Sequence, residues 1–218
     1  YTLALSKEYS ATMMPAGAKG TPNHAEKVMK YYSIATGDSS AEISLLEGNS
    51  GLKVVYYNQG DAAWKSIPYS TSTIGQSGCG PTSMAICIST LSGKKITPRQ
   101  TCQWAGSQGY YVKGAGSKHD VIPGLAKKYG VKCKGVGKNK PQIIQALKTG
   151  KLVVAIMSAG HFTSGGHFIV LTGIKDGKIT VADCGSRQRT KQTWSLDLIV
   201  NESNSSASAG GPFWIISK

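Results

Sequence analysis

The sequence predicts an α+β fold in which helices come first and pack on an antiparallel sheet made by the later strands. Apolar residues recur at helical spacing in the middle of the chain, whereas short runs rich in β-branched residues dominate its last third. Between two of these runs, Asp176-Gly177 is typical of a tight hairpin turn. Helices and strands segregated in this way characterise α+β domains, and 218 residues suffice for one domain and an appendage.

The first 50 residues are expected to form a linker or arm rather than part of the core. A Met-Pro-Ala-Gly run at residues 14–17 indicates a loop, and residues 22–36 have the apolar spacing of one helix. We therefore expect the compact domain to span residues 51–218. Because tyrosine rather than methionine begins the sequence, we expect a mature chain or a fragment, and the sequence shows no signal peptide.

The middle of the chain is predicted to hold four helices. The first follows Cys79-Gly80-Pro81, where proline suits a helix start because its missing N–H needs no partner there. The second opens with a capping box between Thr97 and Gln100. By apolar spacing, the four helices span 80–92, 97–107, 119–130 and 140–149.

The strands are predicted mainly after the helices. One strand-like run, residues 52–57, precedes them, and a Ser/Gly/Asn-rich segment at 203–211 is expected to be an exposed loop. The later strands are predicted at 152–157, 167–174, 178–183 and 212–217.

A cysteine at the start of the first predicted helix is the first candidate for chemistry. Unpaired N–H groups and the positive end of the helix dipole stabilise a thiolate at such a position. Most free cysteines are small core residues, but a Gly-Cys-Gly-Pro turn is poorly suited to a core. The sequence thus predicts Cys79 as a nucleophile.

A histidine and an aspartate on one predicted hairpin are the candidate base and its orienting group. His167 begins one strand and Asp183 ends the next, and pairing about the turn brings residues 167–168 opposite 184–185. A hydrogen bond between the two side chains would fix the imidazole tautomer and leave its other nitrogen for Cys79. Singly, each could be an ordinary strand-end residue; together with Cys79 they indicate catalysis.

Two other histidines have less support from the sequence as catalytic residues. His161 is an alternative base, but no orienting acid is evident beside it in the sequence. Its glycine-rich loop, residues 158–166, is expected to form one wall of the cleft, and His119 is expected in a cap region or on the surface. Aromatic residues that could line a second wall are Trp104, Tyr110 and Tyr111.

Acyl transfer also needs hydrogen-bond donors for the oxyanion. The backbone N–H of Cys79 would be one donor, and a side-chain amide the second. Gln59 ends the run at 52–57 and can be held rigidly, whereas Gln76 lies near the cysteine in a Ser/Thr/Gly-rich loop. We favour Gln59, and Gln76 stays open because the position of an amide cannot be deduced from sequence.

Several segments together resemble bacterial cysteine peptidases related to the bacteriocin-processing, or double-glycine, peptidases of the papain-like superfamily. They are YYNQ at 56–59, Trp64, IGQSGCGPTSMA at 74–85, IPGLAKKYG at 122–130 and GHFIV at 166–170. The resemblance covers about residues 51–218.

This resemblance implies a papain-like fold with the catalytic cysteine at a helix N-terminus. It implies Cys79 as nucleophile, His167 as general base and acid, Asp183 as orienting group and Gln59 as oxyanion donor. In the bacteriocin-processing enzymes that glutamine lies only a few residues before the cysteine, so Gln59 departs from the pattern. Stand-alone relatives of this kind often look like secreted cell-wall or phage-type enzymes.

Charge and cysteine usage limit which partners and cofactors are expected. The net charge of +14, from 25 Lys and Arg against 11 Asp and Glu, favours anionic polymers, but scattered lysines and few arginines argue against specific nucleic-acid readout. No apolar run approaches the ~18 residues of a membrane helix. The five cysteines include no C-x-x-C pair, so we expect no metal or cofactor. Cys87 is expected in the core, and no disulfide can be assigned among Cys87, Cys102, Cys133 and Cys184.

Together these features predict a monomeric, secreted or cell-wall-associated bacterial cysteine peptidase. It would cleave peptide amide bonds through Cys79, His167 and Asp183, and the expected substrate is peptidoglycan, with anionic wall polymers as further partners. The alternatives are a protease acting on a protein or leader peptide, a transpeptidase or transglutaminase with the same triad, and a non-catalytic basic wall-binding module.

Overall fold

The structure is a computed structural model that describes residues 44–47 and 51–218. The predicted helix at 22–36 lies outside these residues, so the helix and the predicted arm stay predictions. Strand β1 (Ser44–Glu47), inside the range predicted for the arm, pairs antiparallel with β2 (Lys53–Tyr56).

Four helices follow their predicted ranges to within two residues at either end: α4 (Cys79–Ser92), α5 (Pro98–Ser107), α6 (Val121–Tyr129) and α7 (Lys140–Lys148). The predicted capping box of α5 is confirmed, since Thr97 accepts from the N–H of Gln100 while Gln100 accepts from that of Thr97. Three short helices were not predicted: α3 (Ile74–Ser77), α8 (Arg187–Thr190) and α9 (Leu196–Glu202).

The later strands form one six-stranded sheet in the order β11-β10-β9-β8-β12-β7, and every neighbouring pair is antiparallel. Its strands are β7 (Lys132–Gly135), β8 (Leu152–Met157), β9 (His167–Lys175), β10 (Lys178–Ala182), β11 (Thr193–Trp194) and β12 (Phe213–Ser217). Two-residue strands pair elsewhere as β3 (Pro68–Tyr69) with β4 (Ser72–Thr73) and β5 (Tyr111–Val112) with β6 (Gly116–Ser117). The prediction of helices packed on an antiparallel sheet is therefore confirmed.

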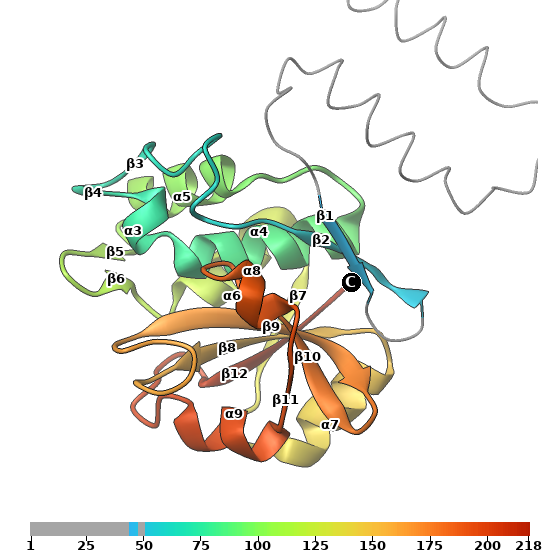
Figure 1. Ribbon diagram of the computed structural model, residues 1–218. Coiled ribbons are helices and arrows are strands. Elements are labelled where there is room, and N and C mark those ends of the chain that lie inside the picture. Colours follow the sequence, from blue (N-terminus) through green and yellow to red (C-terminus); the bar gives the residue numbers. More distant parts are fainter. Residues whose placement is uncertain (1–43, 48–50) are drawn as a thin grey trace, which may run out of the picture. The chain divides into compact units, whose positions relative to one another are not determined.

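Helices cover both faces of this sheet. Figure 1 shows α3 to α6 over one face and α7 and α9 over the other. On the second face, alternate residues of β8 and β9 point into an apolar core shared with the two helices, as strand geometry requires. That core includes Ile143, Leu147, Val153, Ala155, Met157, Ile169, Leu171, Ile199 and Phe213.

The β9–β10 hairpin carries the two predicted catalytic side chains on its open end. Asp176 and Gly177 both adopt positive φ, at 50° and 73°, as the tight turn between right-twisted strands requires. Further along, the register shifts between Thr180 and Val181, so that Val181 pairs with Leu171. This bulge brings the end of β10 one residue closer to the start of β9, where His167 lies.

Candidate active site

Cys79 is the first residue of α4, and Gly78 is its N-cap. Its side chain is partly exposed, whereas Cys87, Cys102 and Cys184 are buried. Pro81 is the third residue of the helix rather than the first, but it still falls in the first turn, where N–H groups have no intrahelical partner. The sulfur of Cys79 therefore sits at the positive end of a 14-residue helix.

The glycines around Cys79 are required by packing. A Cβ at Gly78 would lie 2.6 Å from the carbonyl oxygen of Ile74, and one at Gly80 would lie 3.3 Å from the ring of Phe168. A larger residue at either position would push the start of α4 away from α3 or from β9. The glycines thus set how closely the helix brings Cys79 to the strand that begins with His167.

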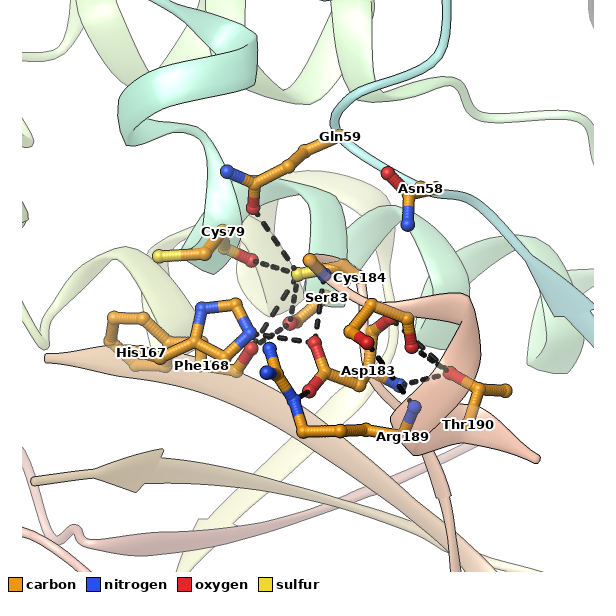
Figure 2. A network of polar contacts seen from close by, with 12 residues as sticks. Asn58, Gln59, Cys79, Ser83, His167, Phe168, Asp183, Cys184, Arg189 and Thr190 are labelled. Atoms are coloured by element: carbon orange, nitrogen blue, oxygen red, sulfur yellow. Dashed lines mark hydrogen bonds and ion pairs between the residues drawn. The ribbon is translucent and has the colours of Figure 1, made fainter. Parts of the chain in front are cut away.

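His167 and Asp183 meet as the sequence predicted. The Nε2 of His167 lies 2.8 Å from Oδ1 of Asp183, with both side chains almost completely buried. Figure 2 shows the other ring nitrogen of His167 on the side of Cys79. The imidazole therefore lies between the thiol and the carboxylate.

Two further groups hold the carboxylate of Asp183. The N–H of Gly185 donates to Oδ1 at 2.8 Å, and Nε of Arg189 donates to Oδ2 at 2.5 Å. A Cβ at Gly185 would lie 3.0 Å from the ring of His167, so glycine lets the loop pass under the imidazole. With both oxygens bonded, the carboxylate cannot rotate away from His167.

The pKa values of Cys79 and His167 are shifted in opposite directions. Burial raises the pKa of the Cys79 thiol, but the interaction with His167 and the N–H groups of Phe168 and Gly80 outweigh it, and the pKa is lowered. Burial lowers the pKa of His167, but Asp183 and Cys79 together raise it to about 9. The two shifts favour the pair of thiolate and imidazolium over the pair of neutral groups, and the thiolate is the reactive form of a cysteine nucleophile.

The pKa of Asp183 is lowered. Burial of this carboxyl raises its pKa, but the bond to His167, the Arg189 guanidinium and the N–H of Gly185 outweigh that effect. The acid is therefore ionised when His167 carries its proton, as an orienting group must be.

Gln59 lies in a loop that side chains of its neighbours make rigid. Asn58 accepts from the N–H of Gly60 at 2.8 Å and donates to the hydroxyl of Tyr56, which in turn donates to the backbone oxygen of Asp183. The indole of Trp64 donates to the backbone oxygen of Asn58 at 2.7 Å. The loop is thus tied directly to the strand end that carries the candidate orienting acid.

The amide of Gln59 lies beside Cys79. Its Nε2 donates to the backbone oxygen of Gly75 at 2.8 Å, which leaves its second hydrogen for another acceptor, and Figure 2 shows the amide above Cys79. Gln76, the other glutamine considered, is exposed on α3, where it accepts from Ser72 at 3.2 Å.

A cleft of about 540 Å³ opens at Cys79. Residues between β5 and α6 line much of it, and only Gly166 of the glycine-rich loop contributes. The lining also includes Val112, Gly114, Ala115, Ser117, Lys118, His119, Asp120, Ile156, Phe168, Asn204 and Ser208. The predicted aromatic wall is therefore wrong for this cleft. The expected wall residues pack on other rings instead: Trp104 on Tyr110, and Tyr111 on Tyr69.

His119 lines this cleft instead of serving only as a cap or surface residue. Its Nδ1 accepts from the backbone N–H of Ser208 at 3.0 Å, and its ring packs against Phe168 and Trp214. Sequence gave no signal for this placement, because Ser208 lies in the predicted exposed loop far along the chain.

His161 does have a carboxylate partner, contrary to the expectation from sequence. Its Nδ1 pairs with Oε1 of Glu202, and its backbone N–H donates to the other oxygen at 2.8 Å. Its ring packs against Trp194. Glu202 lies on the unpredicted helix α9, 41 residues further along the chain, so no local pattern could reveal the pair.

Arg189 and Gly185 are the site residues that sequence reasoning missed. Gly185 is two residues from Asp183 and could have been suspected from the turn, but Arg189 reaches the carboxylate only because α8 folds back over β10.

Within the described part of the chain, no cluster of three or more His, Cys, Asp or Glu could hold a metal ion. Nor is any helix there long and apolar enough to cross a membrane.

Comparison with known proteins places this arrangement. Two solved structures are similar: a Bacillus anthracis protein described as a C39-like peptidase, and the peptidase domain of Streptococcus ComA, a bifunctional ABC transporter of a quorum-sensing pathway. The Bacillus anthracis protein is 17% identical with a TM-score of 0.51, and the match covers 82% of this chain and 98% of that protein's chain. The ComA domain is 13% identical with a TM-score of 0.45, and the match covers 65% of this chain and 91% of the ComA chain. No curated protein matches the chain. Residues 51–209 match the family described as Peptidase_C39 like. The chain belongs to this family and is a cysteine peptidase with a papain-like fold.

Proposed function

We propose that this peptidase hydrolyses peptide amide bonds of bacterial peptidoglycan through a triad of Cys79, His167 and Asp183, outside the cell. The thiolate of Cys79 attacks the carbonyl carbon, and the imidazolium of His167 gives its proton to the leaving amine. His167 then takes a proton from water, which attacks the thioester and releases the acid and the thiolate. Asp183 orients the imidazole and stabilises its positive charge throughout.

The observation that carries the catalytic part is the coupled geometry of the three groups. A pKa lowered at Cys79 and raised to about 9 at His167 is what a thiolate–imidazolium nucleophile needs, and it occurs at the mouth of a cleft. The backbone N–H of Cys79 and Nε2 of Gln59 are the proposed oxyanion donors, because the amide of Gln59 lies above Cys79 in Figure 2 and Nε2 keeps one hydrogen after its bond to Gly75.

The peptidoglycan part rests on charge and on the cleft. A net charge of +14 attracts the chain to the anionic polymers of a Gram-positive wall. Five of the thirteen residues that line the cleft are glycine, alanine or serine, and these small residues leave room for the short side chains of wall peptides and cross-bridges. A secreted or wall-associated location follows from this substrate.

The test is to digest purified Gram-positive sacculi and to identify new ends by mass spectrometry, with Cys79→Ala as the inactive control. New amine and carboxyl ends that require Cys79 would support the proposal, and their masses identify the bond. Casein and a double-glycine leader peptide serve as competing substrates. Cleavage of either one, with intact sacculi, would overturn the wall substrate while keeping the triad. Products that contain a new amide bond would instead reveal a transpeptidase.

A further inference from the structure

A second thiol, that of Cys184, lies directly behind the candidate site. It is fully buried, and its sulfur lies 3.5 Å from three oxygens: Oε1 of Gln59 and the backbone oxygens of Cys79 and Phe168. The hydroxyl of Ser83 lies 3.6 Å from the same sulfur. Figure 2 shows Cys184 at the centre of this network, with the amide of Gln59 above it and the side chain of Asp183 below it.

The neighbours of this sulfur require it to be protonated. Three of them are oxygens that can only accept hydrogen bonds, so a thiolate there would face three partial negative charges. Burial and the nearby Cys79 and Asp183 accordingly raise the pKa of Cys184, the opposite of the shift at Cys79. Cys184 is therefore a hydrogen-bond donor and not a second nucleophile.

Cys184 also holds Gln59 through the backbone. The N–H of Gln59 donates to the backbone oxygen of Cys184 at 2.8 Å. One residue thus contacts Gln59 at both ends: its carbonyl binds the main chain, and its thiol faces the side-chain oxygen.

We propose that Cys184 is a positioning residue. It keeps the carboxamide of Gln59 in one of the two orientations that exchange the places of its oxygen and nitrogen. In the observed orientation the thiol faces Oε1, and Nε2 bonds to the oxygen of Gly75 with one hydrogen to spare. The flipped amide would set Oε1 against the oxygen of Gly75, which has no hydrogen to donate, and would replace the S–H contact to Oε1 by a weaker one from Nε2 to the sulfur. Cys184 thereby keeps an N–H donor directed at the oxyanion; this inference rests on the proposed role of Gln59.

The test separates oxyanion binding from nucleophile reactivity. Acetyl-glycyl-glycinal forms a tetrahedral adduct with Cys79 whose oxygen needs the oxyanion donors, whereas alkylation by iodoacetamide does not. The affinity of the aldehyde is measured as protection of Cys79 against iodoacetamide, with the alkylated residue located by mass spectrometry. No substrate is needed, so the outcome is independent of whether sacculi are cleaved.

We expect Gln59→Ala to weaken aldehyde protection by about 100-fold and Cys184→Ala by about 5- to 10-fold, whereas the rate of alkylation without aldehyde changes less than about 2-fold. Cys184→Ser, which keeps a donor, should stay close to the native protein. The double variant Gln59→Ala/Cys184→Ala should be no weaker than Gln59→Ala alone, because Cys184 acts through Gln59.

Additive losses in the double variant, or an equal loss in Cys184→Ser and Cys184→Ala, would overturn the inference and leave Cys184 as a packing residue. If Gln59→Ala itself has no effect, or the aldehyde fails to protect the native protein, the proposed oxyanion site fails and the inference fails with it. The unprotected alkylation rate shows in each variant whether the Cys79 site is still assembled, and Cys184→Ser serves if Cys184→Ala does not fold.

Discussion

Two histidine–carboxylate pairs lie on the same domain, and only one of the two is beside the candidate nucleophile Cys79. In the first, the His167 and Asp183 side chains are 10% and 0% exposed. In the second, those of His161 and Glu202 are 59% and 17% exposed. Asp183 is bonded by Gly185 and Arg189 as well as by its histidine, whereas the carboxylate of Glu202 binds the ring and the backbone N–H of His161.

The difference lies in the setting of each pair, because both histidines have an acid partner. Electrostatic interactions strengthen as water is excluded, so the same pair shifts a pKa far more in the buried setting. The pKa of His167 is raised to about 9, and Cys79 contributes to that shift. Burial, a clamped acid and an adjacent thiol together distinguish the candidate base.

Exchanging the two histidines for alanine tests the comparison most directly. His167→Ala should lower kcat/KM by about 1,000-fold or more, because the thiolate loses its counterion and the leaving amine its proton donor. His161→Ala should stay within about 3-fold, because its ring contacts Glu202 and Trp194 and does not line the cleft at Cys79. Steady-state kinetics on the cleaved substrate measures both. A large loss in His161→Ala would make His161 the base.

The two acids provide the next comparison. Asp183→Asn should lower kcat by about 100- to 10,000-fold, since an amide can hold His167 in the wrong tautomer and cannot stabilise its charge. Glu202→Gln, the matched change at the exposed pair, should leave kcat nearly unchanged. Steady-state kinetics measures kcat, and the rate at which iodoacetamide labels Cys79 measures the reactivity of the thiol. If Asp183→Asn leaves the labelling rate unchanged, Asp183 does not act on Cys79 through His167.

The pH dependence sharpens the comparison further. The active form needs a thiolate at Cys79 and a proton on His167, so kcat/KM should fall about tenfold per pH unit above the raised His167 pKa of about 9. Because the pKa of Cys79 is lowered, iodoacetamide should label it faster at neutral pH than it labels a thiol with an ordinary pKa. Asp183→Asn should move the upper limb to lower pH, because the imidazolium loses its stabilising anion; His161→Ala should not move it.

The smallest expected effect concerns the clamp on Asp183. Arg189→Gln should raise the pKa of Asp183, lower kcat/KM by about 5- to 20-fold and reduce stability by about 1–3 kcal/mol, because a buried carboxylate loses a charged partner. Arg187→Gln is the control. Its partner Asp61, at 2.7 Å, is partly exposed, so its loss should reduce stability by less than about 1 kcal/mol. Thermal unfolding and steady-state kinetics of both variants measure these effects. Equal losses of stability and activity in Arg189→Gln and Arg187→Gln would mean that the contact of Arg189 with Asp183 has no specific role.

Local patterns were enough to predict the main elements and the family to which they belong. The capping box of α5, the helix that starts at Cys79 and the Asp176-Gly177 turn each depend on residues a few positions apart. The hairpin brought His167 and Asp183 together for the same reason, since both lie on one pair of strands joined by a two-residue turn. The match to the family and the similar solved structure confirm the predicted family and fold class.

Other features were decided only by contacts between distant segments. The insertion of β12 between β8 and β7, the closure of α8 onto Asp183 and the pairing of His161 with Glu202 join residues that share no local pattern. The same holds for His119 at the cleft and for the thiol of Cys184 behind Gln59. A sequence can thus determine which residues begin a helix or face each other across a turn, because those contacts are short-range. Which arginine clamps an acid, or which thiol orients an amide, depends on how the whole sheet and its helices pack.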